Sequence, residues 1–295
     1  MTPRARNLLS RIVYLVVIGF IAVFLWKQGV EPWQTTLAIW PVMIWVMIVA
    51  PFTLTVQAVA FHYCLPANAP IPSLTRLIRI WAIASITSFV APLIAGLAVR
   101  TTLLMKEGID IRTSSIGTLR QTWLNIDYAW FTVALLLVFY PWSQVPMLGY
   151  GLMTAWLVLK LMRIYAKKNR LSSHRYLSNL FPHSLNKLPW KAQPWLWGQI
   201  MIMAFNYWMA FRLGGAPLSW HSSLLLAGLT ILASVAVIIP NGLGVLDALW
   251  VWIATQQGLS LAESVALALT MRMGMLLGIT VVWGVLFLTG EGSPS

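Results

Sequence analysis

Two short stretches decide how this sequence folds: SFVAPLIAGLAVR at residues 88–100 and VIIPNGLGVLD at residues 237–247. Each lies in the middle of a long apolar run, about residues 77–105 and 222–256, and each brings a proline and at least one glycine there. Proline removes a backbone donor and clashes with the preceding helical turn, and glycine lowers helix propensity further. Each run is therefore predicted to break into two half-helices.

The two broken runs also match each other. In both, a proline is followed four residues later by a glycine, and then by a charged residue, a second glycine and an arginine. The two series are Pro92, Gly96, Arg100, Gly108 and Arg120, and Pro240, Gly244, Asp247, Gly258 and Arg272. Two apolar runs precede each break and one follows it. This pattern predicts one membrane domain, residues 1–295, built from repeat 1 at about 1–140 and repeat 2 at about 145–289.

The composition indicates an integral membrane protein. Hydrophobic residues make up 59% of the chain and charged ones 9%, with a mean hydropathy of +0.77, whereas soluble domains are about a quarter charged. A hydrocarbon core about 30 Å thick is crossed by about 20 helical residues. The unbroken runs of suitable length lie at about 12–26, 37–61, 123–140, 145–165, 195–214 and 262–288.

Charge placement predicts the topology. The formal net charge is +13; in a soluble protein this would point to nucleic acid, but here the positive-inside bias explains it without a nucleic-acid partner. If both broken runs are re-entrant, the basic N-terminus, residues 76–79, residues 106–112 and a basic loop at about 167–193 share one side. If the first broken run crosses instead, that bias is lost.

We therefore expect an all-α fold of six transmembrane helices plus two re-entrant hairpins that enter from opposite faces, an inverted internal repeat. Both termini and the basic loop are expected on the cytoplasmic side of a bacterial inner membrane. Such folds place the substrate site near the midplane, where the broken helices meet.

Charged residues near the breaks are the candidates for function, because a central Arg or Asp costs about 2.5–3.5 kcal/mol on insertion scales. Arg100 and Asp247 serve either a substrate or the membrane interface. Arg120 can snorkel to the head groups, and Asp127 can reach the interface or pair with an arginine. Half-helix N-termini beside arginines favour an anionic group. The candidate binding residues are Pro92, Gly96, Arg100, Arg120, Asp127, Pro240, Asn241, Gly242, Gly244, Asp247 and Arg272.

Redox, metal and hydrolytic chemistry find no support. Cys64 is the one cysteine, and the four histidines lack metal-ligand spacing. The P-loop, H-E-x-x-H and G-x-S-x-G patterns are absent from the sequence. We expect no cofactor, no metal and no enzymatic activity.

The segment PNGLGVLDALWVWIATQQGLSLAESVALALTMR, residues 240–272, resembles the Pro-Gly-Gly-x-Gly-x-x-Glu segment, Gly turn and intramembrane Arg of the flippase-like membrane domain of the lysylphosphatidylglycerol synthase family. Asn241 and Asp247 replace the first Gly and the Glu of that pattern. The segment APLIAGLAVRTTLLMKEGI, residues 91–109, resembles the family's Pro-Gly-Arg-x-Gly-Asp-x-x-Arg segment. It keeps Pro92, Gly96 and Arg100 but has Leu93, Ile94 and Leu97 at other family positions, and Trp123 and Leu124 stand where the family's Glu-Arg pair is usual.

The resemblance covers nearly the whole chain and implies translocation of lipids or handling of lipid-linked precursors, without the aminoacyl-transferase domain. Our leading hypothesis is a flippase-like protein whose partners are membrane lipids with an anionic head group. The alternatives are an ion-coupled transporter of a small solute, using Asp127 or Asp247, and a non-transporting partner subunit. Oligomeric state is left open.

Overall fold

The computed structural model describes residues 39–66, 69–70, 72–90, 93–140, 147–168, 190–236 and 245–288. The predicted first crossing at 12–26 and most of the basic loop at 167–193 lie outside these ranges. Within them the secondary structure is helical, as predicted. The helices are α3 (Trp40–Cys64), α4 (Leu74–Val90), α5 (Leu93–Lys106), α6 (Ile111–Phe139), α7 (Leu148–Lys168), α9 (Gln193–Leu213), α10 (Trp220–Ala236), α11 (Val245–Gln256) and α12 (Leu261–Leu288), with a 3-10 turn, η3, at Trp190–Ala192.

Three of these helices, α3, α6 and α12, are long and apolar enough to cross a membrane. Shorter apolar stretches lie in α7 (Leu148–Met162) and α10 (Trp220–Ser234). The membrane character predicted from composition is therefore present in the folded chain.

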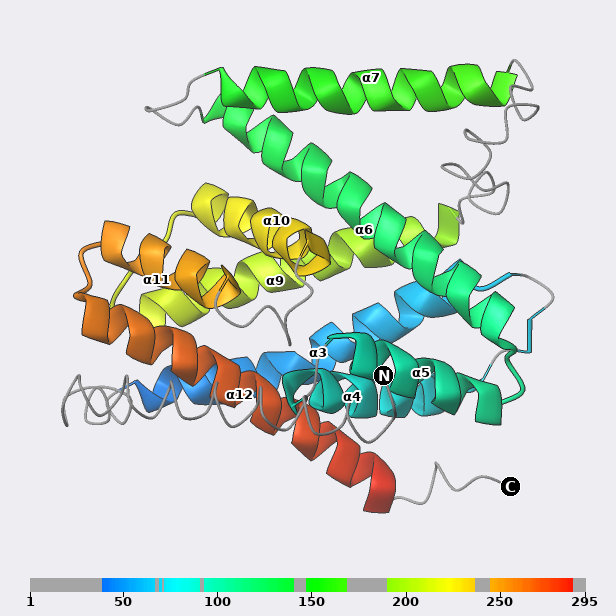
Figure 1. Cartoon of the computed structure of the whole chain (residues 1–295). Coiled ribbons are helices and arrows are strands. Elements are labelled where there is room, and N and C mark those ends of the chain that lie inside the picture. Colours follow the sequence, from blue (N-terminus) through cyan, green and yellow to red (C-terminus); the bar gives the residue numbers. More distant parts are fainter. Residues whose placement is uncertain are drawn as a thin grey trace, which may run out of the picture.

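Both broken runs supply two helices each. In Figure 1, α4 and α5 form a hairpin whose open end lies at the right of the molecule, while α10 and α11 form one whose open end lies at the left. The α4/α5 pair is much more closely packed than the α10/α11 pair. The two hairpins thus approach the centre of the molecule from opposite ends.

Gly96 allows the close approach of α5 to α4. A β-carbon added there would lie 1.8 Å from Ser88 Oγ and 2.7 Å from the Ala84 carbonyl oxygen. Any other side chain would collide with the backbone of α4, so a glycine is required where the hairpin is tightest.

The two hairpins end in the same kind of turn. Gly108 and Gly258 have positive φ, 83° and 94°, a region that L-residues with a β-carbon seldom enter. The residue after each glycine donates its N–H to a carbonyl five positions earlier, Leu104 at 3.0 Å and Ala254 at 3.3 Å. This is the Schellman pattern, which stops α5 and α11.

The long helices that follow, α6 and α12, begin three residues after these glycines and are both capped. The Asp110 carboxylate accepts a hydrogen bond from the Thr113 N–H at 2.9 Å, which lowers the pKa of Asp110. Ser260 and Glu263 form a capping box, with Ser260 N–H to Glu263 Oε2 at 2.8 Å. Side-chain caps satisfy N–H groups that have no partner in the first turn of a helix.

Helix α3 lies at the centre and contributes to two apolar clusters along its length. Val42 and Val46, near its start, join a cluster with α9, α10, α11 and α12. The later residues Ala50, Leu54, Ala58 and Phe61 join a cluster with α4, α5 and Ile279 of α12. Gly274 and Gly278 bring α12 against α3, where added β-carbons would lie 2.6 Å from Met43 O and 2.5 Å from Met47 O. Small residues four apart allow membrane helices to pack this closely.

Candidate functional site

A cavity of about 500 Å³ lies between the two hairpins and the central helices. It is lined by side chains from α3, α4, α5, α6, α9, α10, α11 and α12. Of the predicted binding residues, Arg100 and Arg272 line it together, although 172 positions separate them in the sequence. The cavity is therefore bounded by both halves of the chain.

Arg100, on α5, is held by one hydrogen bond and two aromatic rings. Its Nη2 donates to Thr118 Oγ1 on α6 at 2.8 Å, and its Cζ lies 4.6 Å from the ring centre of Trp81 and 5.4 Å from that of Phe61. Its Nε is buried and has no hydrogen-bond partner among the described residues. Cation–π contacts stabilise the guanidinium without neutralising its charge.

Arg272, on α12, forms an ion pair with Asp247 on α11 through Nε and Oδ1. The side chains are 10% and 25% exposed. Its Cζ also lies 5.6 Å from the ring centre of Trp250. The predicted residues Asp247 and Arg272 thus act as a pair, and the charge of Arg272 is compensated by its neighbour.

None of the acidic residues that the structure describes forms an ion pair with Arg100. Glu107 pairs with Arg76 at 2.8 Å, Asp127 pairs with Lys160, and Asp247 pairs with Arg272. Asp110 and Glu263 cap helices. The cavity consequently contains one arginine that is paired with a carboxylate and one that is not, which gives its wall a net positive charge.

Neutral polar side chains complete the wall, and the sequence interpretation missed them. Carboxamides come from α3 (Gln57), α6 (Gln121 and Asn125) and α9 (Gln199). Gln121 Nε2 donates to the main-chain carbonyl oxygen of Gln57 at 3.0 Å. Gln199 is 5% exposed, and its side-chain Oε1 has no partner in the described part of the chain. Single glutamines on separate helices form no motif. The sequence signal that could have identified them is that several glutamines occur inside apolar runs.

Two further predicted residues that the structure describes, Arg120 and Gly96, lie outside the cavity wall. Arg120 donates to the Cys64 carbonyl oxygen at 3.3 Å, outside the wall of the cavity. Gly96 packs α5 on α4 and does not line the cavity. The other predicted positions, Pro92, Pro240, Asn241, Gly242 and Gly244, are outside the described residues.

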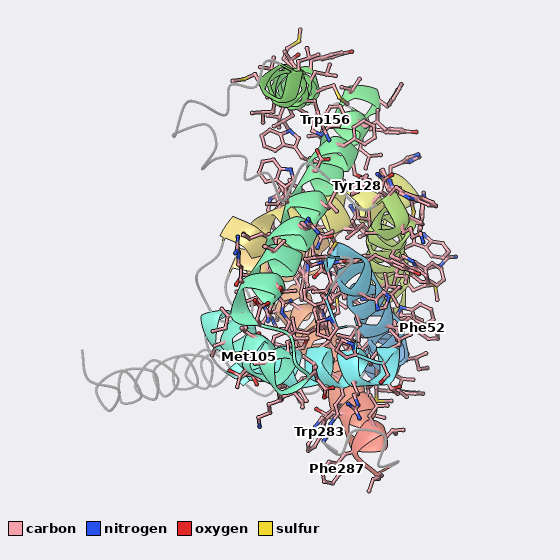
Figure 2. All side chains as sticks on the ribbon, turned by 90° about the vertical axis from the view of Figure 1, so that its right-hand side faces the viewer. Phe52, Met105, Tyr128, Trp156, Trp283 and Phe287 are labelled. Carbon is pink, nitrogen blue, oxygen red and sulfur yellow. The ribbon has the colours of Figure 1, made fainter. Side chains whose placement is uncertain are left out.

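Asp127 holds α7 to α6, away from the cavity. Its carboxylate accepts from Lys160 Nζ and, at 3.0 Å, from Trp156 Nε1, both on α7. Figure 2 shows Trp156 beside α6 below α7, far from Met105 at the end of α5. In the described residues α7 packs chiefly on α6, and Asp127 therefore serves a helix contact there.

Metal binding has no candidate among the described residues, where no three His, Cys, Asp or Glu side chains gather in a suitable group. The chemistry that the wall offers is non-covalent: two guanidinium groups, carboxamides, hydroxyls and aromatic faces.

The family model described as the lysylphosphatidylglycerol synthase TM region matches residues 10–282, which is most of the 295-residue chain. The chain belongs to this family. Membership confirms the resemblance seen at the two broken runs and identifies a multi-pass membrane protein related to lipid handling. No curated protein and no solved structure gives a significant match.

The residues matched by the lysylphosphatidylglycerol synthase TM family model include both arginines of the cavity, both hairpins and all the carboxamides of the wall. The matched region therefore includes the whole of the described site.

Proposed function

We propose that this protein binds an anionic lipid, or a lipid-linked precursor, by its head group in the central cavity and moves it across the membrane without chemical change. The observation that carries the proposal is Arg100, a cavity-lining cation with no carboxylate partner among the described residues. A charge held at membrane depth is costly and marks a substrate path. A phosphate group would supply the missing counter-charge.

The two arginines have different parts in this proposal. Arg100 meets the phosphate directly, because a guanidinium presents several N–H donors in one plane and Arg100 Nε is unused by the described chain. Arg272 is bound to Asp247, so a second anion has to compete with that carboxylate. Such competition makes binding at Arg272 weaker and reversible, as transport requires.

The proposal includes the topology: six spans and two re-entrant hairpins in an inverted repeat, with both termini cytoplasmic in a bacterial inner membrane. It is supported by the opposite approach of the two hairpins (Figure 1) and by the equivalent turns at Gly108 and Gly258. Single cysteines at Lys106 and Gln257, in a Cys64→Ala background, should then react with a membrane-impermeant maleimide from opposite sides. Labelling from one side would contradict the inverted arrangement.

Translocation is tested with purified protein in vesicles that carry tail-labelled phosphatidylglycerol or phosphatidylcholine, with dithionite bleaching of the outer leaflet. Phosphatidylglycerol should exchange between leaflets faster than phosphatidylcholine. Arg100→Gln should slow it about tenfold or more, because a hydrogen-bonded charge pair contributes about 1.5–3 kcal/mol. Arg212→Gln, an exposed arginine at the end of α9, is the matched control and should leave the rate unchanged.

The alternatives give different results in the same vesicles. Equal rates for both lipids, or an Arg100→Gln rate equal to that of the control, would refute lipid recognition by Arg100. Uptake of a phosphorylated solute without any lipid exchange would favour a small-solute transporter.

A further inference from the structure

Among the described residues that line the central cavity, neutral hydrogen-bonding groups are common and none can neutralise a cation. Its hydroxyls come from Thr118, Thr122, Tyr207, Thr230 and Ser234, in addition to the four carboxamides. Among its described residues there is no Asp, Glu, His or Lys. Such a wall can bind an anion and many neutral polar groups, but it has no carboxylate for an ammonium group.

Three buried polar atoms of residues in this wall lack a partner among the described residues: the donors Arg100 Nε and Trp250 Nε1, and the acceptor Gln199 Oε1. A buried polar atom without a hydrogen bond costs about 1–3 kcal/mol, so each needs a group from outside the described chain. The donors are suited to phosphate oxygens. The acceptor needs a ligand O–H or N–H.

The aromatic faces decide between a hydroxyl and an ammonium donor. The rings of Trp81 and Trp250, which would otherwise attract an ammonium group, already carry Arg100 at 4.6 Å and Arg272 at 5.6 Å. A further cation in this cavity would be repelled by Arg100, whose charge no carboxylate of the described residues compensates. A hydroxyl carries no charge, and a carboxamide serves it as both donor and acceptor.

We infer that the cavity selects a phosphorylated polyol, such as a glycerol phosphate or sugar phosphate head group, and discriminates against head groups that carry an amine. The phosphate binds at Arg100 and the hydroxyls bind along the carboxamide wall, with Gln199 accepting from one of them. The inference rests on the proposed function where the polyol is part of a lipid; the same chemistry applies to a soluble polyol phosphate.

The test compares head groups on identical labelled tails in the same proteoliposomes. Phosphatidylglycerol and phosphatidylserine have the same net charge, but the first carries hydroxyls and the second an amine. Phosphatidylglycerol and phosphatidylinositol should exchange about tenfold or more faster than phosphatidylserine and phosphatidylethanolamine. Phosphatidylserine exchange as fast as that of phosphatidylglycerol would overturn the inference while leaving lipid translocation intact.

A soluble arm separates the two proposals. Vesicles are offered radiolabelled glycerol phosphate or phosphoethanolamine. If no lipid exchanges and only glycerol phosphate enters, the polyol inference holds and lipid transport fails. If no arm distinguishes hydroxyl from amine, the inference fails.

Gln199→Met tests the hydroxyl contact within one protein. Methionine keeps the length of the side chain but has no strong acceptor, so exchange of phosphatidylglycerol should fall about threefold to tenfold, the value of one hydrogen bond. Exchange of phosphatidic acid, which has the phosphate but no polyol, should not change. Because the result is a ratio of two lipids, a partly misfolded sample does not affect it.

Gln257→Met is the control, since Gln257 is exposed and lies outside the wall of this cavity. It should leave the ratio of phosphatidylglycerol to phosphatidic acid unchanged. A Gln199→Met protein whose ratio equals that of the control would refute hydroxyl recognition by Gln199.

Discussion

Replacing Gly278 by alanine should loosen the contact of α12 with α3 and destabilise the protein. A β-carbon at this position would lie 2.5 Å from the Met47 carbonyl oxygen and 2.7 Å from the Ala50 β-carbon. Carbon contacts are favourable at about 3.5–4.0 Å, so the two backbones would have to move apart by roughly 1 Å. Neither obstacle is the end of a flexible side chain, so no simple rotation relieves the clash.

The expected change in the free energy of unfolding of Gly278→Ala is the sum of two opposed effects. Overpacking of a close contact costs about 1–3 kcal/mol, while exchange of a helical glycine for alanine contributes about 1 kcal/mol of helix propensity in the other direction. We expect a net loss of about 1–2 kcal/mol in the free energy of unfolding. The same displacement moves Arg272, one and two-thirds turns earlier on α12, so phosphatidylglycerol exchange should slow as well.

Gly284 provides the matched control on the same helix. A β-carbon there would meet nothing within 4 Å, so Gly284→Ala should leave stability unchanged or raise it by up to about 1 kcal/mol. The measurement is helix loss by circular dichroism during titration of detergent-solubilised protein with sodium dodecyl sulfate. Equal midpoints for Gly278→Ala and Gly284→Ala would refute the packing described for α12 and α3.

Two further predictions concern the ion pairs. In a double-mutant cycle of Lys160→Met and Asp127→Asn, the coupling should be about 1 kcal/mol in the unfolding titration, with lipid exchange unaffected; a large loss of exchange would show that Asp127 has a part in transport. Arg272→Gln leaves the Asp247 carboxylate without its partner, and should therefore be more destabilising, by about 1–3 kcal/mol, than Arg272→Gln combined with Asp247→Asn. A double variant less stable than the single one in that titration would contradict the pairing.

The features predicted correctly are those that depend on local sequence. Long apolar runs predicted helices, and the proline and glycine interruptions predicted that two of the runs would each yield a pair. The family was identified from the motif at residues 240–272, and its model matches residues 10–282. Arg100 and Arg272 were selected because charge is costly in a membrane, and both line the cavity; their binding role stays a prediction.

The features that were missed depend on which helices meet. Gln57 and Gln199 are not distinctive within the sequences of α3 and α9. They line the cavity together because those two helices pack side by side around it. Asp127 was a candidate that could reach the membrane interface or pair with an arginine. The structure pairs it with Lys160 on the next helix, a contact whose separation of 33 residues no local pattern encodes.

The turns at Gly108 and Gly258 have a consequence for biosynthesis. The hydrogen bonds that close them span six residues or fewer, so each turn can form as soon as its own residues have left the ribosome. The first hairpin and the start of α6 can therefore reach their geometry while most of the second half is still unmade. The cavity is different, because Arg272 lies on α12, the last helix described. A nascent chain that ends before α12 would contain Arg100 but lack Arg272 and Met275, the part of the cavity wall that α12 supplies.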